Sequence, residues 1–172
     1  MGHGARVRRA RRVGDPRLLR IVDGHGEEEL PAIRRLFEEY AASLDVDLTF
    51  QDFSRELGEL PGDYVPPAGR ILLALDDDEP AGCVALRPYE PDVCEMKRLY
   101  VRPAFQSSGL GRRLAAAIVD AGRDAGYRLM RLDTLPTMEA ARGLYRSLGF
   151  EEIEAYRPNP VHGTTFFQLR LR

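Results

Sequence analysis

The spacing of hydrophobic residues between positions 18 and 60 predicts a short strand followed by two helices. Residues 18–22, four of them apolar, predict a short strand that ends at an Asp23-Gly24 turn signal. Apolar residues at helical spacing over 27–44 predict a long helix with acidic residues in its first turn. A shorter helix is predicted over 50–60, where Pro61-Gly62 ends it, and an irregular loop follows.

Beyond residue 70 the pattern changes to apolar runs of strand length, interrupted by two helical segments. Gly126 and Gly149 are expected to end these two helices. Strands are predicted over 70–75, 81–87, 94–101, 128–134, 151–156 and 164–171, and helices over 108–125 and 138–148. This order of elements predicts an α/β layer fold around one mixed sheet.

Length and charge divide the chain into a short arm and one domain. A chain of 172 residues, 44% of them hydrophobic, can bury one core. Residues 1–17 hold six arginines and one aspartate, a charge of +5, which leaves −7 of the total of −2 for residues 18–172. We interpret 1–17 as a basic, disordered arm and 18–172 as a single domain. The weaker alternative is an arm that contacts nucleic acid or an anionic surface. No apolar run has the length of a membrane span.

The two cysteines, Cys83 and Cys94, both fall in predicted strands, and no histidine cluster accompanies them. Two thiols without further ligands do not form a metal site, so no metal is expected. We interpret them as buried free thiols of a protein in the reducing cytoplasm.

The segment 93–111 carries the main chemical signal. It predicts a strand, a short turn and a helix whose first residues are Ser107, Ser108, Gly109, Leu110 and Gly111. Small residues allow a ligand to approach the backbone closely, and the free amides of a first helical turn bind anions such as a pyrophosphate. The alternative is that these small residues only permit tight packing.

Two motifs give this chain its resemblance to a known family. The residues Gln-Ser-Ser-Gly-Leu-Gly at 106–111 fit the Gln/Arg-x-x-Gly-x-Gly/Ala loop of the Gcn5-related N-acetyltransferases (GNAT). Residues 140–150 resemble the family's second signature, a helix that ends with Leu-Tyr-x-x-x-Gly-Phe. The motifs stand in the family's order, about 35 residues apart, and the resemblance extends over residues 18–171.

The resemblance implies a fold, a cosubstrate and the residues that bind it. The fold is a mixed, splayed central sheet with helices on both faces, and the thioester of acetyl-CoA lies between the strands 94–101 and 128–134. Main-chain pairing with the pantetheine arm resembles the addition of a strand. The residues implied to bind acetyl-CoA are Leu99, Tyr100, Val101, Gln106, Ser107, Ser108, Gly109, Leu110, Gly111 and Arg112.

Two residues are candidates for catalysis. Glu95 lies eleven residues before Gln106, where relatives often place a glutamate that acts as a base through water. Burial should raise its pKa and suit it to that task. Its alternative role is an ion pair with Lys97 or Arg98, and Lys97 is expected to be that partner or a solvent-facing charge.

Tyr145 is the candidate general acid, because the family's tyrosine at this helix position points at the coenzyme sulfur. Its alternative role is that of a core tyrosine. Many relatives have an asparagine seven residues earlier that contacts the coenzyme, but Met138 stands here. Thr134 or Thr137 could replace that contact.

The acceptor is the least determined part of the reaction. Its candidate pocket residues are the acids Asp45, Asp47 and Asp52, the aromatic residues Phe50, Phe53 and Tyr64, and the loop residue His162. Each could instead be an ordinary surface or core residue. We expect a small-molecule amine as acceptor and allow for a homodimer. The alternatives are a protein lysine or N-terminal acetyltransferase and a non-catalytic acetyl-CoA-binding module.

Overall fold

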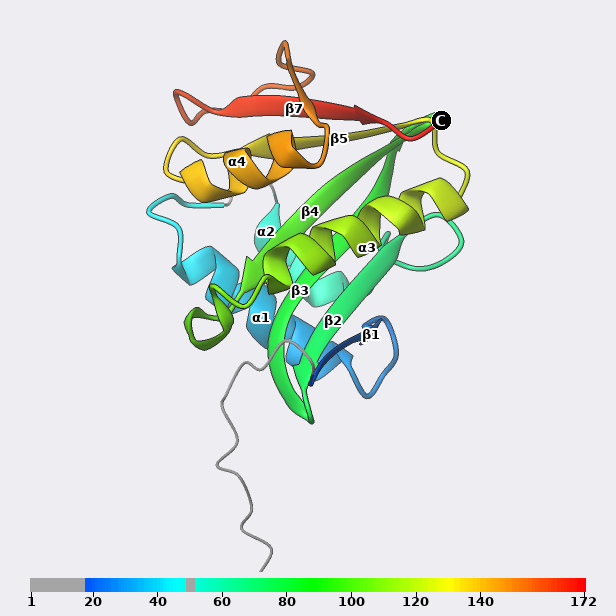
Figure 1. Cartoon of the computed structure of the whole chain (residues 1–172), viewed down its shortest axis with the longest axis vertical. Helices are drawn as coiled ribbons and strands as arrows, with labels where there is room; N and C mark the ends of the chain where they lie inside the picture. The colour runs from blue at the N-terminus through cyan, green and yellow to red at the C-terminus, as the bar shows by residue number, and fades with distance from the viewer. Residues whose placement is uncertain (1–17, 49–51) are drawn as a thin grey trace, which may run out of the picture.

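A seven-stranded sheet organises the part of the chain that the computed structural model describes, residues 18–48 and 52–172 (Figure 1). The strands are β1 (Leu19–Asp23), β2 (Arg70–Asp76), β3 (Glu79–Glu90), β4 (Val93–Val101), β5 (Leu129–Thr134), β6 (Glu151–Ile153) and β7 (Thr165–Arg170). Their order is β1-β2-β3-β4-β5-β7-β6, and only the pairing of β4 with β5 is parallel. The predicted mixed sheet is therefore confirmed.

The helices are α1 (Leu30–Ala42), α2 (Phe53–Glu59), α3 (Leu110–Asp124) and α4 (Glu139–Ser147), with a short 3-10 helix, η2 (Pro103–Phe105). The sequence did not predict η2. It also placed acids in the first turn of α1, which is wrong because the helix begins later, next to Pro31. Proline suits a first helical turn, because its φ is fixed and its missing amide has no helical partner there. The predicted arm, 1–17, and Phe50 lie outside the described residues.

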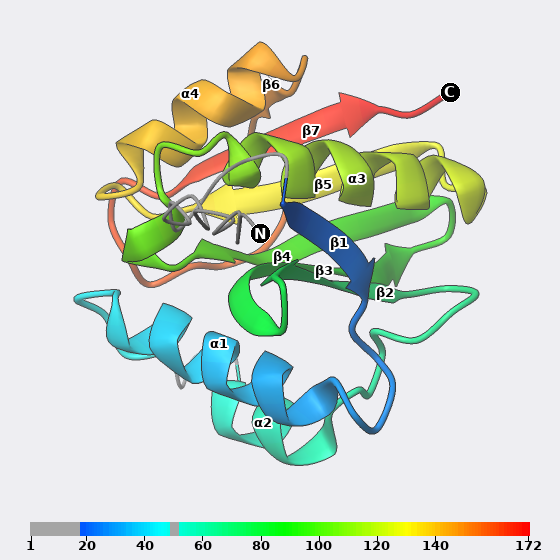
Figure 2. The same ribbon diagram turned by 60° about the horizontal axis from the view of Figure 1, so that its bottom comes forward.

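The sheet separates two hydrophobic cores, as Figure 2 shows: α1 and α2 cover one face, and α3 and α4 lie on the other. Ile33 and Phe37 of α1 pack with Ile71 in one core. Leu114 and Ile118 of α3 belong to the other. Adjacent residues of β2, Ile71 and Leu72, enter different cores, as the period of a strand requires. The predicted burial of both cysteines as free thiols is confirmed.

A bulge interrupts β4 in its second half. Ala85 of β3 pairs with Lys97, but Cys83 pairs with Tyr100, so β4 has one extra residue in this interval. Arg98, with a φ of 59°, is that residue. Two successive side chains, Lys97 and Arg98, therefore lie on the α1/α2 face, where Arg98 stacks on Tyr40 at 5.6 Å.

The parallel strands β4 and β5 separate along their length (Figure 1). Their paired residues are Val93 with Leu129, Cys94 with Met130, and Glu95 with Arg131. Beyond this point β5 continues to pair with β7 as far as Thr134. The splayed sheet implied by the family resemblance is thus present. No helix within 18–48 and 52–172 is long and apolar enough to cross a membrane.

Candidate active site

A groove runs along the open side of β4, between the strand and the helices α1 and α4. Its volume is about 480 Å³. Leu99, Tyr100 and Val101 line one wall, and Ala141 and Leu144 of α4 line another. The three strand residues proposed to bind the pantetheine arm therefore face a space that could accommodate an extended ligand.

The groove reaches the turn before α3. Gln106 and Gly111 line it, and the amides of Gly111 and Arg112 donate to no backbone carbonyl of the described residues. Gly109 has a φ of 79°, and a Cβ added there would meet no heavy atom within 4 Å. Free amides at a helix start, bordered by open space, fit a phosphate group.

The remaining residues of this turn have structural contacts. Ser108 accepts a hydrogen bond from the Leu110 amide at 3.3 Å, and the Leu110 side chain is buried in the core. Arg112 donates to Ser147 at 2.6 Å. Their part in coenzyme binding stays a prediction.

A small cavity of about 30 Å³ lies where β4 and β5 part. A water molecule needs roughly 10–15 Å³ in this measure, so the cavity admits one or two waters or the end of a ligand. Lys97, Thr134 and Tyr145 line it, together with Tyr40 and Met138, which also line the groove. The Thr134 hydroxyl, in a side chain that is 2% exposed, has no hydrogen-bond partner among the described residues. A buried, unsatisfied hydroxyl is costly, so this one marks a place for a water or a ligand.

Met138 thus borders both spaces in place of the family's asparagine. Of the two proposed replacements, Thr137 lines the groove and Thr134 lines the cavity. Either hydroxyl can offer the hydrogen bond that the thioether of Met138 cannot.

Tyr145 is held at the cavity by an aromatic cluster. Its ring lies 5.6 Å from that of Phe150 and 6.2 Å from that of Phe167. Burial raises the pKa of Tyr145 well above its ordinary value, and the negative charge of Asp133 adds to this effect. The hydroxyl therefore stays protonated at neutral pH.

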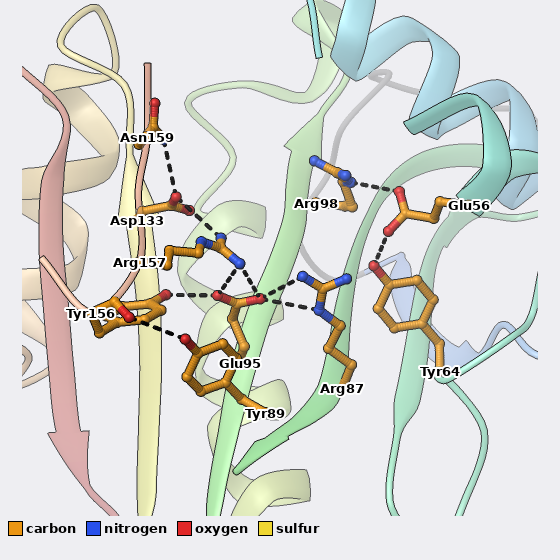
Figure 3. A network of polar contacts seen from close by, with 10 residues as sticks. All are labelled: Glu56, Tyr64, Arg87, Tyr89, Glu95, Arg98, Asp133, Tyr156, Arg157 and Asn159. Carbon is orange, nitrogen blue, oxygen red and sulfur yellow. Dashed lines mark hydrogen bonds and ion pairs between the residues drawn. The ribbon is translucent and has the colours of Figure 1, made fainter. Parts of the chain in front are cut away.

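Glu95 is fully buried and sits at the centre of an ion-pair network (Figure 3). Its Oε1 accepts hydrogen bonds from Nε and Nη2 of Arg87 at 3.0 and 2.9 Å and from Arg157 at 3.1 Å. Its Oε2 accepts from the Tyr156 hydroxyl at 2.7 Å. The expected raised pKa is wrong: burial alone would raise the pKa of Glu95, but Lys97, Arg157 and Arg87 lower it below its ordinary value.

Of the two expected alternative partners of Glu95, Lys97 is the one whose charge acts on it. Arg98 donates from Nε to Glu56 at 2.9 Å, and Glu56 also accepts from Tyr64 (Figure 3). Lys97 does attract Glu95, but it is 5% exposed and so is not a solvent-facing charge. Burial lowers the pKa of Lys97 to about 7, although Glu95 and Asp133 oppose this shift.

The sequence analysis missed the part of the site that comes from β5 and from the segment between β6 and β7. Asp133 accepts from Arg157 at 3.1 Å and from Asn159 at 3.3 Å (Figure 3). Arg157 therefore bridges Glu95 and Asp133. No local motif marks these residues, since they lie far apart along the chain and meet only through the fold.

The predicted acceptor residues do not gather at the cavity. Asp45 lines the groove, whereas Asp52 lines a separate hollow of about 290 Å³ with Glu56, Tyr64 and Arg87. Phe53 is buried beneath Arg98, whose guanidinium lies 5.0 Å from the ring centre. Asp47 and His162 are exposed side chains outside the lining of both the cavity and the groove.

Comparison with known proteins identifies relatives over most of the chain. The model of the acetyltransferase (GNAT) family matches residues 30–150. An uncharacterized N-acetyltransferase of Schizosaccharomyces pombe is 40% identical over 146 residues, 84% of this chain and 90% of that protein. The uncharacterized N-acetyltransferase YjgM of Escherichia coli is 30% identical over 125 residues, 71% of this chain and 74% of that protein.

Solved structures share the fold at lower identity. An acetyltransferase of the GNAT family from Staphylococcus aureus has a TM-score of 0.75 and 16% identity, over 90% of this chain and 99% of that one. The Salmonella typhimurium protein yncA, solved with its cofactor acetyl-CoA, has a TM-score of 0.66 and 22% identity, over 90% and 95% of the two chains. The family model and the 40% identical relative show the family, and the solved structures show the same fold. The chain belongs to the GNAT acetyltransferases and is an N-acetyltransferase that uses acetyl-CoA as its cosubstrate.

Proposed function

We propose that the protein transfers the acetyl group of acetyl-CoA to the primary amine of a small molecule by direct attack of that amine. The observation that carries this proposal is the cavity between β4 and β5, which is only about 30 Å³ in volume and is lined by Lys97, Thr134 and Tyr145. Such a narrow space favours the end of a small amine. A broad, open groove would instead favour a protein substrate.

The residues of the groove fit the cosubstrate. Acetyl-CoA supplies an activated thioester, and the amides of Gly111 and Arg112 can bind its pyrophosphate. The backbone of Leu99, Tyr100 and Val101 can bind its pantetheine arm as an added strand would. The orphan hydroxyl of Thr134 supports this assignment, because it lacks a partner among the described residues at the place where the reactive end would lie.

We assign Tyr145 the role of donor to the departing sulfur. Its raised pKa keeps the proton on the hydroxyl, and the residue lines the cavity at its helix α4 wall. A hydrogen bond to a developing thiolate stabilises charge in the transition state more than in the ground state, which is the requirement for catalysis.

The negative charge of the hollow beside Glu56 and Arg87 supports a cationic acceptor. The hollow beside Glu56 and Arg87 is lined by four carboxylates, Asp52, Glu56, Glu59 and Asp63, against two arginines. Its negative balance attracts an ammonium ion. Arg87 and Glu56 also belong to the networks around Glu95 and Arg98, so this hollow lies next to the acceptor side of β4.

The experiment is a panel of amines and short peptides with acetyl-CoA, followed by release of free thiol. Calorimetry with acetyl-CoA accompanies it. We expect coenzyme binding and turnover of small amines. Peptides acetylated in preference to free amines would indicate a protein acetyltransferase, and binding without any turnover would indicate a non-catalytic module. The cytoplasmic location and a homodimer stay predictions.

A further inference from the structure

Lys97 is the sole lysine of the chain, and the fold places it where a proton must move. It lies two residues beyond Glu95, the last residue of β4 that pairs with β5. It lines the cavity at the split and shares that cavity with Tyr145. Glu95 is absent from the lining of this cavity. The lysine, rather than the glutamate, therefore lines the cavity.

The two residues also differ in their capacity to accept a proton. Both carboxylate oxygens of Glu95 accept hydrogen bonds, from Arg87, Arg157 and Tyr156. These donors stabilise the charged form and make protonation unfavourable. A buried lysine behaves in the opposite way, because its burial favours the neutral amine, which carries a lone pair.

The groups that face Lys97 come from every element around the cavity. Glu95 on β4 and Asp133 on β5 stabilise its ammonium form, whereas Arg98 on β4 and Arg157, between β6 and β7, oppose it. Tyr40 of α1, Thr134 of β5 and Tyr145 of α4 add uncharged hydroxyl groups to the lining. The effects of the two carboxylates and of the two guanidinium groups oppose each other. Burial is therefore the largest effect on Lys97, and it lowers the pKa of this residue to about 7.

We propose that Lys97 is a catalytic residue, the general base that removes the proton from the acceptor amine, and that Glu95 positions it. This inference rests on the proposed function of amine acetylation. In this mechanism the buried ion-pair network has a function. Glu95 holds Lys97 at the cavity, and its charge influences the pH at which the lysine becomes neutral.

The step balances as follows. The acceptor first releases its ammonium proton to solvent. Its neutral nitrogen then attacks the thioester carbonyl, so a C–N bond forms and the C–S bond breaks with its electron pair on sulfur. Nζ of Lys97 takes the proton that the nitrogen loses, and the thiolate takes the proton of Tyr145. The Lys97 ammonium then returns its proton to the Tyr145 oxygen. A thiol has a pKa of about 8.5, so net transfer from an ammonium of pKa about 7 to the thiolate is favourable.

The first test needs no substrate, because the chain has one lysine. Protein labelled with nitrogen-15 in lysine should give a single Nζ signal in nuclear magnetic resonance spectra, and its titration reports Lys97 alone. We expect a midpoint near pH 7 and a lower midpoint in Glu95→Gln, since a carboxylate that favours the ammonium is removed. A midpoint near the ordinary lysine value, about 10.4, would overturn the proposal.

The second test separates the base from a structural charge. Lys97→Arg keeps the positive charge beside Glu95 but cannot lose its proton at these pH values, and Lys97→Met removes both properties. We expect kcat to fall about 10²–10⁴-fold in each, with the affinity for acetyl-CoA unchanged in calorimetry. The limb of the pH–rate profile near pH 7 should vanish in both variants and move to lower pH in Glu95→Gln.

The outcomes keep this inference distinct from the proposed function. Retention of the limb in Lys97→Arg, with its loss in Glu95→Gln, would return the role of base to Glu95 while amine acetylation stands. Lack of coenzyme binding or turnover in the wild-type protein would refute the proposed function, whatever the lysine titration shows. If Lys97→Met fails to fold, Lys97→Arg and the wild-type titration still decide the matter.

Discussion

The two sides of β4 are built in different ways. On the side of α3 and α4, the groove is lined by apolar residues such as Leu99 and Val101 and by the start of α3 with its free amides, and α1 borders it on the other side. On the side of α1 and α2, charged residues from distant segments meet around Glu95 and Arg98. The α3/α4 side suits acetyl-CoA, the ligand common to the family. The residues of the α1/α2 side can differ between family members that use different acceptors. Mutations that act on one side alone test this division.

The largest expected effect is a loss of stability from a mutation on the α1/α2 side of β4, where the charged residues lie. Glu95→Gln removes a buried negative charge among Arg87, Arg157 and Lys97. Breaking a buried ion pair costs about 3–5 kcal/mol, so the free energy of unfolding in urea should fall by about 3 kcal/mol.

The matched control is Glu152→Gln, which breaks the surface pair with Arg146, whose side chains are 60% and 56% exposed. Exposed pairs contribute about 0–1 kcal/mol, so its loss should be small. Equal losses in the two variants would show that the network around Glu95 is no more important than a surface pair.

On the groove side, Gly109→Asp should abolish detectable binding of acetyl-CoA in calorimetry. The new carboxylate would stand in the open space in front of the amides that open α3 and repel the phosphates. Gly109→Asn is the control, since asparagine has nearly the same shape, tolerates a positive φ and carries no charge. The asparagine variant should retain measurable binding; if both variants bind normally, the phosphate site lies elsewhere.

Tyr145→Phe acts at the boundary between the two sides and should lower kcat about 100-fold. Its coenzyme affinity should stay the same, because the aromatic contacts with Phe150 and Phe167 remain. Steady-state kinetics combined with calorimetry separates the two quantities. Unchanged turnover would remove Tyr145 from the reaction and leave it as a core residue.

The smallest effect concerns stability in acid. The folded-state pKa values of Glu95 and Asp133 lie below their ordinary values of 4.5 and 3.8, as Lys97 and the arginines overcome the effect of burial. The stabilisation from both is therefore complete above pH 5 and is lost as the pH falls through the folded-state pKa values. Asp133→Asn should reduce the slope of unfolding free energy against pH below pH 5; an unchanged slope would contradict a lowered pKa of Asp133.

The success of the sequence predictions differs between the two sides of β4 in the same way. The order of the elements and the family loop before α3 could be read from local patterns, because helical periodicity, turn residues and the loop motif each lie within a short segment. The network around Glu95 could not be predicted, since Arg157 and Asn159 lie more than 60 residues beyond it and nothing in their local sequence marks them.

The bulge in β4 explains why the sequence allowed a solvent-facing Lys97, although this residue is buried. A charged residue beside Arg98 in a strand suggests that at least one of the two faces solvent, because successive side chains point in opposite directions. The bulge at Arg98 breaks this rule and places both on the same buried face. Its position depends on pairing with β3, which the sequence of β4 alone does not encode.

The bulge also determines how β4 responds to changes in length. Leu99 and Val101 contact the α3/α4 core, and Tyr100 contacts the other core, so the strand alternates regularly on either side of Arg98. Deleting Arg98 should leave both halves in phase and yield an uninterrupted strand, at the cost of the contact with Glu56. Deleting Lys97 would restore the same alternation but would remove a residue that lines the cavity. Arg98 is thus a position at which β4 can lose a residue while Lys97, Leu99 and Tyr100 keep their faces of the sheet.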